Sequence, residues 1–198
     1  EPQILRRLPR MGANFDAASR AEIEMCLAAG AKPSQITFGN TIKRPADIAF
    51  AHEIGITHFA VDALAELDKL ADHAPGARVC IRLLVEATGA DWPLSRKFGC
   101  TAAMALTLMD RARDLDLCVS GLSFHVGSQT REPQMWADTL DQVAQVWRAA
   151  KTAGHELTLL NIGGGFPASY GTEVMAPNRY AQEVMALVNA RFPDASEI

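Results

Sequence analysis

The chain has 198 residues, of which 48% are hydrophobic and 21% charged, and this balance is typical of a globular protein with a sizeable core. A formal net charge of −4 and a pI near 5.7, without any basic cluster, argue against nucleic acid or an anionic membrane as a partner. No apolar run approaches the roughly 20 residues of a membrane span and the first residues do not form a signal peptide, so we expect a cytoplasmic protein.

Short β-rich runs alternate with amphipathic helical segments along the chain, which is the pattern of successive βα units. The predicted strands are 14–19, 36–40, 57–62, 78–85, 122–126 and 157–163. The first predicted helix begins after Ser19, and the others cover 45–54, 64–73, 102–115, 136–154 and 179–191. A long irregular connection precedes the helix at 102–115. Ser19 with Glu22 forms a capping box, and Gly30, Gly55 and Gly154 stand where glycines end helices.

Alternating strands and helices predict a parallel sheet covered on both faces, as in a doubly wound sheet or a (β/α) barrel. Polar residues follow nearly every predicted strand: Asp16, Ser19, Asn40, Asp62, Arg82, Glu86, His125 and Ser128. A doubly wound fold concentrates its site at one switch point, whereas a barrel collects residues from all strand ends. We therefore expect an α/β fold of the (β/α)8 barrel type. Because a complete barrel needs eight strands and about 250 residues, this chain should hold about six units, without the first and last strands.

Two motifs near the ends of late strands indicate a phosphate site. An apolar strand runs directly into Gly163, Gly164 and Gly165, whose amides can approach an anion closely because glycine has no Cβ. One unit earlier a strand ends in His125, followed by Ser128, whose hydroxyl could also hold a phosphate. The alternatives are a plain turn for the glycines and a structural role for the histidine, and it is the pairing of the motifs that favours a phosphorylated cofactor.

These motifs, F-H-V-G-S at 124–128 and L-N-I-G-G-G-F-P at 160–167, resemble the ornithine decarboxylase family of pyridoxal-phosphate enzymes, whose barrel is similar to that of alanine racemase. Further segments agree: F-D-A-A-S-R-A-E-I at 15–23, F-G-N-T-I-K at 38–43 and L-S-R-K-F-G at 94–99. The resemblance covers almost the whole chain. One departure is Asn161, where many relatives carry Asp.

The resemblance implies pyridoxal 5'-phosphate as cofactor and a set of residue roles. His125 would stack on the pyridoxal ring, and Ser128 with Gly163, Gly164 and Gly165 would bind the phosphate. Asp16 would lie near the nitrogen that joins substrate and cofactor, and Arg82 near the ring's phenolic oxygen and Asp16; an ion pair with a purely structural role is the alternative for these two. Lys97 is as well explained as a solvated cation.

Parts of the family's site are not expected among residues 1–198. The lysine that carries the cofactor belongs to a strand before the helix matching residues 1–10, and the E-P-G-R strand follows the end of this chain. The family's C-terminal β domain, which completes the site across a homodimer, is also absent. We therefore interpret residues 1–198 as a partial pyridoxal-phosphate-binding barrel domain, inactive on its own.

The function predicted for the parent is decarboxylation of a basic amino acid, foremost L-ornithine to putrescine, with lysine as a second substrate. Diaminopimelate decarboxylase is the near alternative, and an inactive regulatory homologue of the antizyme-inhibitor type is the distant one. A small cofactor carrier without a second domain is a third. The four cysteines, Cys26, Cys80, Cys100 and Cys118, form no C-x-x-C pair, so we expect reduced, buried thiols and no metal site.

Overall fold

The computed structural model describes residues 2–86, 90–92 and 97–198, so residues 94–96 of the L-S-R-K-F-G segment lie outside the described residues. The chain divides into two compact units. Unit 1 comprises Glu1–Cys80 and Leu108–Val119, and unit 2 comprises Ile81–Thr107 and Ser120–Ile198.

The strands alternate with helices as the sequence predicts. The strands are β1 (Phe15–Ala17), β2 (Ile36–Phe38), β3 (His58–Val61), β4 (Arg78–Arg82), β5 (Ala90–Trp92), β6 (Cys118–Ser123), β7 (Ser128–Thr130) and β8 (Leu159–Asn161). The α-helices are α1 (Pro2–Arg7), α2 (Arg20–Ala28), α3 (Pro45–Glu53), α4 (Leu64–His73), α5 (Ala102–Asp114), α6 (Ala137–Thr152) and α7 (Pro177–Arg191). Three short 3-10 helices are η1 (Pro9–Met11), η2 (Pro33–Gln35) and η3 (Pro133–Trp136).

Six strands form one sheet in the order β1-β2-β3-β4-β6-β8. The pairs β1–β2, β2–β3 and β6–β8 are parallel, with Phe15 opposite Ile36 and Gly121 opposite Leu159. Because strand order follows chain order and a helix joins each strand to the next, the topology is that of part of a (β/α) barrel. The predicted fold class is confirmed.

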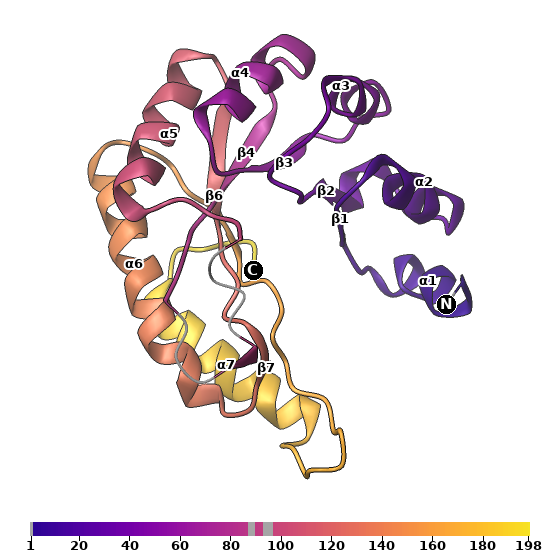
Figure 1. Cartoon of the computed structure of the whole chain (residues 1–198), viewed down its shortest axis with the longest axis vertical. Coiled ribbons are helices and arrows are strands. Elements are labelled where there is room, and N and C mark those ends of the chain that lie inside the picture. The colour runs from indigo at the N-terminus through magenta and orange to yellow at the C-terminus, as the bar shows by residue number, and fades with distance from the viewer. Residues whose placement is uncertain (1, 87–89, 93–96) are drawn as a thin grey trace. The chain divides into compact units, whose positions relative to one another are not determined.

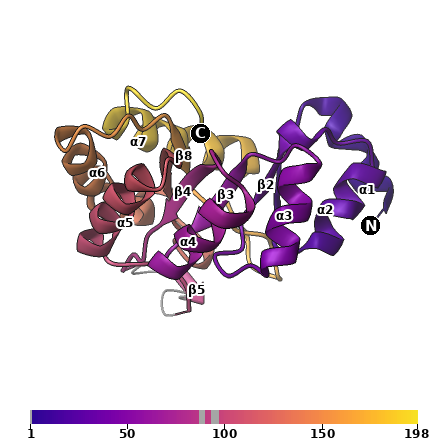
Figure 2. The same ribbon diagram turned by 90° about the horizontal axis from the view of Figure 1, so that it is seen from above.

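In unit 1, helices α2, α3 and α4 lie one after another beside strands β1 to β3 (Figures 1 and 2). Helix α2 packs on α3, and α3 packs on α4. The core between helices and strands is apolar and includes Ile23, Phe38, Ile48, Phe59 and Leu67, each at most 2% exposed. The predicted capping interaction is present, since the Ser19 hydroxyl accepts the Glu22 N–H at 3.3 Å.

In unit 2, helices α6 and α7 lie side by side (Figure 1). Trp147 of α6 meets Phe192, just after α7, edge to face at 5.5 Å between ring centroids, a favourable aromatic geometry. Val143 and Val188 are fully buried between these elements. Trp136 and Trp147 are both buried core residues.

Two predicted details are wrong. Strand β6 ends at Ser123, so His125 lies in a loop instead of inside a strand at 122–126. The last ladder bond runs from the Phe124 N–H to the Asn161 carbonyl at 3.1 Å, and Gly127, with φ at 97°, then turns the chain. The connection predicted as irregular contains β5, which pairs antiparallel with β7; its three residues are too few to produce a visible alternation.

The cysteines are free thiols, of which Cys26, Cys80 and Cys100 are buried and Cys118 is exposed. The expectation of a buried thiol is therefore wrong for Cys118, the first residue of β6. No helix in the described part of the chain has the length and apolar character needed to cross a membrane.

Candidate functional site

The loops that follow β6 and β8 in unit 2 are hydrogen-bonded to each other. The Thr130 N–H donates to the Gly165 carbonyl at 2.9 Å. The side-chain amide of Gln129 makes two further bonds to the Ala168 backbone, accepting its N–H at 2.7 Å and donating to its carbonyl at 3.1 Å. The structure therefore brings together the two motifs, the loop of His125 and Ser128 and the glycine turn.

The glycine turn has a backbone that only glycine accommodates at its two ends. Gly163 and Gly165 have φ of 68° and 117°, and a Cβ would lie 2.3 Å from the Phe124 carbonyl oxygen at Gly163 and 2.4 Å from the Gly127 carbonyl oxygen at Gly165. Side chains at these two positions are therefore excluded by both strain and space.

The three amides of this turn do not have the same role. The Gly163 N–H donates to the side-chain oxygen of Asn161 at 2.9 Å, so that donor is already used within the turn. In the described part of the chain, the N–H groups of Gly164 and Gly165 make no hydrogen bond. The amides of Gly164 and Gly165 therefore remain open. The side-chain carboxamide of Asn161 accepts the hydrogen bond that orders the glycine turn, so the Asp of many relatives is not needed at this position.

His125 is half-buried, and its ring has a defined protonation pattern. Its Nδ1 accepts the Gly127 N–H at 2.9 Å, which requires that nitrogen to be unprotonated. Burial, together with the positive charge of Arg82, lowers the pKa of His125 below 6.5. The ring is therefore neutral near pH 7 with its proton on Nε2, the atom 3.4 Å from where a Cβ on Gly164 would lie.

Ser128 and Arg82 complete the polar residues of this site in unit 2. Ser128 begins β7 and is half-buried, and no bond of its hydroxyl is present among the described residues. Arg82 ends β4 with its guanidinium carbon 5.1 Å from the centre of the Phe98 ring, which Lys97 also approaches at 5.1 Å. Lys97 is exposed, as expected for a solvated cation.

Asp16 lies in unit 1, in the exposed middle of β1. Its carboxylate lies over Gly39, where a Cβ would come within 1.5 Å of the carboxylate oxygen. Gly39 therefore makes room for Asp16. Since Arg82 belongs to unit 2, the predicted contact between Asp16 and Arg82 stays a prediction.

Comparison with known proteins gives this geometry a family. The family "Pyridoxal-dependent decarboxylase, pyridoxal binding domain" matches residues 1–198. The chain belongs to this family. The finding confirms the resemblance seen in the sequence and identifies pyridoxal 5'-phosphate as the cofactor of the domain.

Relatives and solved structures agree with the family. Ornithine decarboxylase 2 of Drosophila melanogaster is 34% identical over 98% of the chain and 49% of the relative. Antizyme inhibitor 2 of Xenopus laevis is 30% identical over 98% of the chain and 42% of the relative. The lysine/ornithine decarboxylase of Vibrio vulnificus complexed with putrescine superposes with a TM-score of 0.87 and 30% identity over 100% of the chain and 52% of that structure. The chain thus spans about half the length of the proteins it matches.

The residues present in this pyridoxal-binding domain fit a phosphorylated cofactor. Two open amides, the Ser128 hydroxyl and a narrow glycine backbone lie on the same pair of loops, and such groups can donate hydrogen bonds to a phosphate. The neutral ring of His125 adjoins Gly164, where it offers an aromatic face without adding a charge.

A buried ion cluster in unit 1 was missed by the sequence analysis. The Lys43 side chain is fully buried, and its ammonium donates to the carbonyls of Ala60 at 2.6 Å and Asn40 at 3.0 Å. The Glu66 carboxylate lies 3.5 Å from Lys43 and also pairs with Lys69. Burial lowers the pKa of Lys43 to about 8, against the opposing effect of Glu66. The only sequence signal was the position of Lys43 three residues after the strand-end Asn40.

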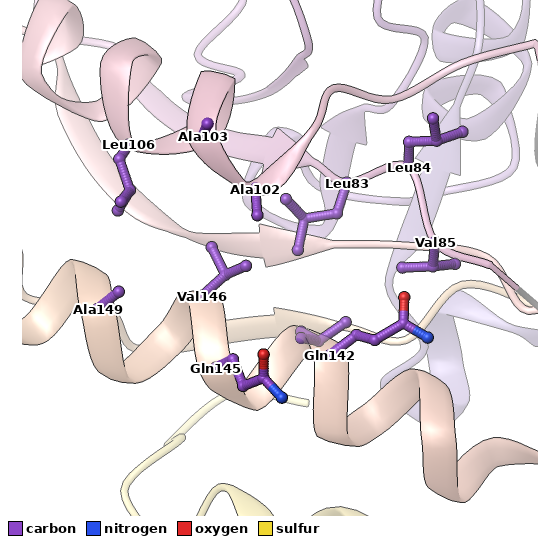
Figure 3. Close-up of a pocket in the computed structure, with 11 residues that line it drawn as sticks. Leu83, Leu84, Val85, Ala102, Ala103, Leu106, Gln142, Gln145, Val146 and Ala149 are labelled. Carbon is purple, nitrogen blue, oxygen red and sulfur yellow. The ribbon is translucent and has the colours of Figure 1, made fainter.

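A separate cavity of about 360 Å³ lies between the start of α5 and α6 in unit 2 (Figure 3). Its walls are apolar, with Leu83, Val85 and Leu106 facing Val146 of α6, and Gln142 supplies a side-chain amide. Gln142 is bonded to the Glu86 backbone at 3.4 Å through both its oxygen and its nitrogen. Among the described residues that line the cavity, none is ionisable and none is a predicted site residue.

Proposed function

We propose that the whole protein containing this chain is a pyridoxal-phosphate-dependent decarboxylase that converts L-ornithine to putrescine, with L-lysine as the alternative substrate of the same class. The observation that carries the proposal is the pair of interlocked loops with open amides at Gly164 and Gly165 beside the neutral His125 ring, in a domain of the pyridoxal-dependent decarboxylase family. Relatives named as ornithine decarboxylases and a neighbour complexed with putrescine support the substrate class.

Each residue of the candidate site has a distinct task in this proposal. The Ser128 hydroxyl and the amides of Gly164 and Gly165 donate to the cofactor phosphate, while Gly163 shapes the turn. The imidazole ring of His125 stacks on the pyridoxal ring of the cofactor. Because the imidazole stays neutral, it positions the pyridoxal ring without attracting the negative charge that develops there. When bound, the cofactor draws electrons from the substrate α-carbon so that carbon dioxide can leave.

Arg82 and Asp16 have electrostatic tasks. The permanent charge of the Arg82 guanidinium keeps a nearby phenolate or carboxylate ionised, and it disfavours a proton on His125. The exposed Asp16 carboxylate, held over Gly39, accepts a proton or a hydrogen bond from an amine nitrogen. We place the enzyme in the cytoplasm as a homodimer with active sites at the interface, in line with the family resemblance.

The test is made on the whole protein, purified without added cofactor. We expect a yellow protein whose absorbance shifts on borohydride reduction, and carbon dioxide release that is fastest with L-ornithine, followed by lysine, with arginine and diaminopimelate slower. Ser128→Ala should weaken cofactor binding about 10-fold, the effect of one lost hydrogen bond to a charged group.

A second candidate function is a regulatory protein without catalytic activity, which the similarity to antizyme inhibitor 2 supports. A colourless protein that releases no carbon dioxide from any of the four amino acids would overturn the enzyme proposal in favour of this candidate. A yellow protein that acts only on diaminopimelate would retain the enzyme class and refute the substrate.

A further inference from the structure

A buried hydrogen-bond relay supports the two loops of the site from behind. Trp136 of η3 and Tyr180 of α7 are 0% and 1% exposed. The Trp136 indole N–H donates to the Tyr180 hydroxyl at 2.9 Å, and the Tyr180 hydroxyl donates to the Thr130 carbonyl. The Thr130 N–H in turn donates to the Gly165 carbonyl at 2.9 Å. The Tyr180 hydroxyl therefore anchors Thr130, the residue whose N–H joins the two loops.

The same aromatic pair also holds the residue after the glycine turn. The Phe166 ring lies 5.7 Å from Trp136 and 5.3 Å from Tyr180, centroid to centroid. Phe166 is 44% exposed, so its buried face rests on this pair while its other face is in solvent. Both the β7 strand and the glycine turn are thus fixed against Trp136 and Tyr180, which lie outside the loops.

We propose that Tyr180 is a positioning residue for the phosphate-binding loops. The inference rests on the proposed function, because Tyr180 is proposed to maintain the distance between the Ser128 hydroxyl and the open amides of Gly164 and Gly165, the groups that would bind the phosphate. Ser128 and Thr130 are two residues apart on β7, on either side of Gln129, whose φ of 58° turns the chain between them. The bonds at Thr130 hold this end of β7 in place and so limit where Ser128, two residues earlier, can lie. The bond from the Thr130 N–H to the Gly165 carbonyl sets the spacing between the two loops.

The physical effect is preorganisation. A phosphate must receive hydrogen bonds from both loops at once, and loops already held in that spacing lose less conformational entropy when it binds. The hydroxyl remains a donor across the working range, since burial raises the pKa of Tyr180 above 10 despite the opposing bond from Trp136. Removing it leaves the Trp136 N–H and the Thr130 carbonyl buried without a partner.

The experiment compares Tyr180→Phe with wild type in the whole protein, using two probes, pyridoxal 5'-phosphate and pyridoxal, which lacks the phosphate. The dissociation constant of each is measured by equilibrium dialysis, and the bound phosphate is followed by 31P NMR. We expect Tyr180→Phe to weaken pyridoxal 5'-phosphate about 10-fold, to leave pyridoxal unchanged, and to shift the 31P resonance.

Trp147→Phe is the matched control. Trp147 is also a buried aromatic residue of the α6 and α7 core, 2% exposed, and its ring packs on Phe192 away from the relay. Trp147→Phe should lower the melting temperature comparably and change neither dissociation constant. Trp136→Phe keeps the Tyr180 hydroxyl and its bond to Thr130, so it should reduce the affinity for pyridoxal 5'-phosphate less than Tyr180→Phe does. This variant replaces Tyr180→Phe in the comparison if Tyr180→Phe does not fold.

The outcomes separate the two proposals. Equal losses for both probes in Tyr180→Phe, or the same pattern in Trp147→Phe, would show that Tyr180 has only a structural role and would overturn the inference. A wild-type protein that binds neither probe, or both equally, would instead refute the proposed phosphate site itself.

Discussion

The two units support their strand-end loops by opposite means. In unit 1 the loop after β2 is held by a buried cation, Lys43, whose ammonium binds carbonyls of the loop and of β3 and pairs with Glu66. In unit 2 the loops after β6 and β8 are held by neutral donors and acceptors, the Tyr180 hydroxyl and the Asn161 carboxamide among them.

The two kinds of support differ in how much they contribute to stability and in how they respond to pH. Buried charges are strong only while every partner is present, because an unpaired charge pays the full desolvation penalty. Neutral hydrogen bonds contribute less each, about 1 kcal/mol, but they do not respond to pH and add no charge near a bound anion. The support of the loops in unit 2 is therefore the same across the neutral pH range, whereas that of the loop in unit 1 changes when Lys43 loses its proton.

The largest expected effect comes from breaking the ionic support. Glu66→Gln keeps the shape of the side chain but leaves the fully buried Lys43 ammonium without a carboxylate, and we expect a loss of about 3 kcal/mol in the free energy of unfolding at pH 7. Urea unfolding of the whole protein measures it. The pair Arg20 and Glu24, 48% and 52% exposed, provides the control, since Glu24→Gln should cost less than about 0.5 kcal/mol.

This loss should depend on pH in a defined direction. The folded pKa of Lys43 is lowered to about 8 from 10.5, so between these values the unfolded chain binds the proton that the folded chain has released. The contribution of Lys43 to stability therefore rises with pH above about 8. With the ammonium neutral, Glu66→Gln costs less, and a cost that is the same at pH 7 and pH 9.5 would contradict the ionic interpretation.

The next effect concerns His125, whose ring is half-buried in unit 2. Because its folded pKa lies below 6.5, the unfolded chain takes up a proton first as the pH falls. Stability from the neutral ring is complete above pH 6.5 and declines as the pH falls toward the lowered folded value. The imidazole resonances in NMR spectra should give a pKa below 6.5 in the wild-type protein.

Arg82→Gln should raise that pKa toward 6.5, since it removes the like charge that lowers it. Lys97→Gln is the matched control, because Lys97 is an exposed cation at the same distance from the Phe98 ring, and it should leave the titration of His125 unchanged. A pKa above 6.5 in the wild type would refute the neutral ring, whereas no response to Arg82→Gln would show that burial alone lowers the pKa of His125.

The smallest effect is expected at Asn161. Asn161→Ala removes the acceptor of the Gly163 N–H and should cost about 1 kcal/mol of stability or less, with about a 3-fold weaker binding of pyridoxal 5'-phosphate measured by dialysis. Asn161→Asp keeps an acceptor at this position and should retain the wild-type stability. Equal stability of Asn161→Ala and wild type would show that the turn is ordered by its glycines alone.

Most of the fold could be predicted because it depends on local patterns. The helix predicted at 64–73 is observed as α4, Leu64–His73, where apolar residues recur at helical spacing. The end of β6 could not be predicted, since F-H-V reads as strand while the chain turns through a bond between Gly127 and the His125 ring. Such side-chain bonds to the backbone leave no periodic trace.

The candidate site was predictable where its chemistry is local. Ser128 with His125, and the three glycines, form two short motifs in the chain, and the proximity of these motifs follows from the parallel pairing of β6 with β8. The burial of Lys43 was not predictable, because the carbonyl of Ala60 and the carboxylate of Glu66 reach it only in the folded unit. Tyr180 was missed for the same reason.

Gln129 has a consequence for how this domain can change in evolution. With φ at 58°, its side-chain amide bonds to the Ala168 backbone as a neighbouring strand would, and it joins two loops that are far apart in the chain. An insertion or deletion in one loop would place the amide opposite the wrong peptide of the other. The lengths of these two loops should therefore vary together among homologues, and a change in one alone should be rare.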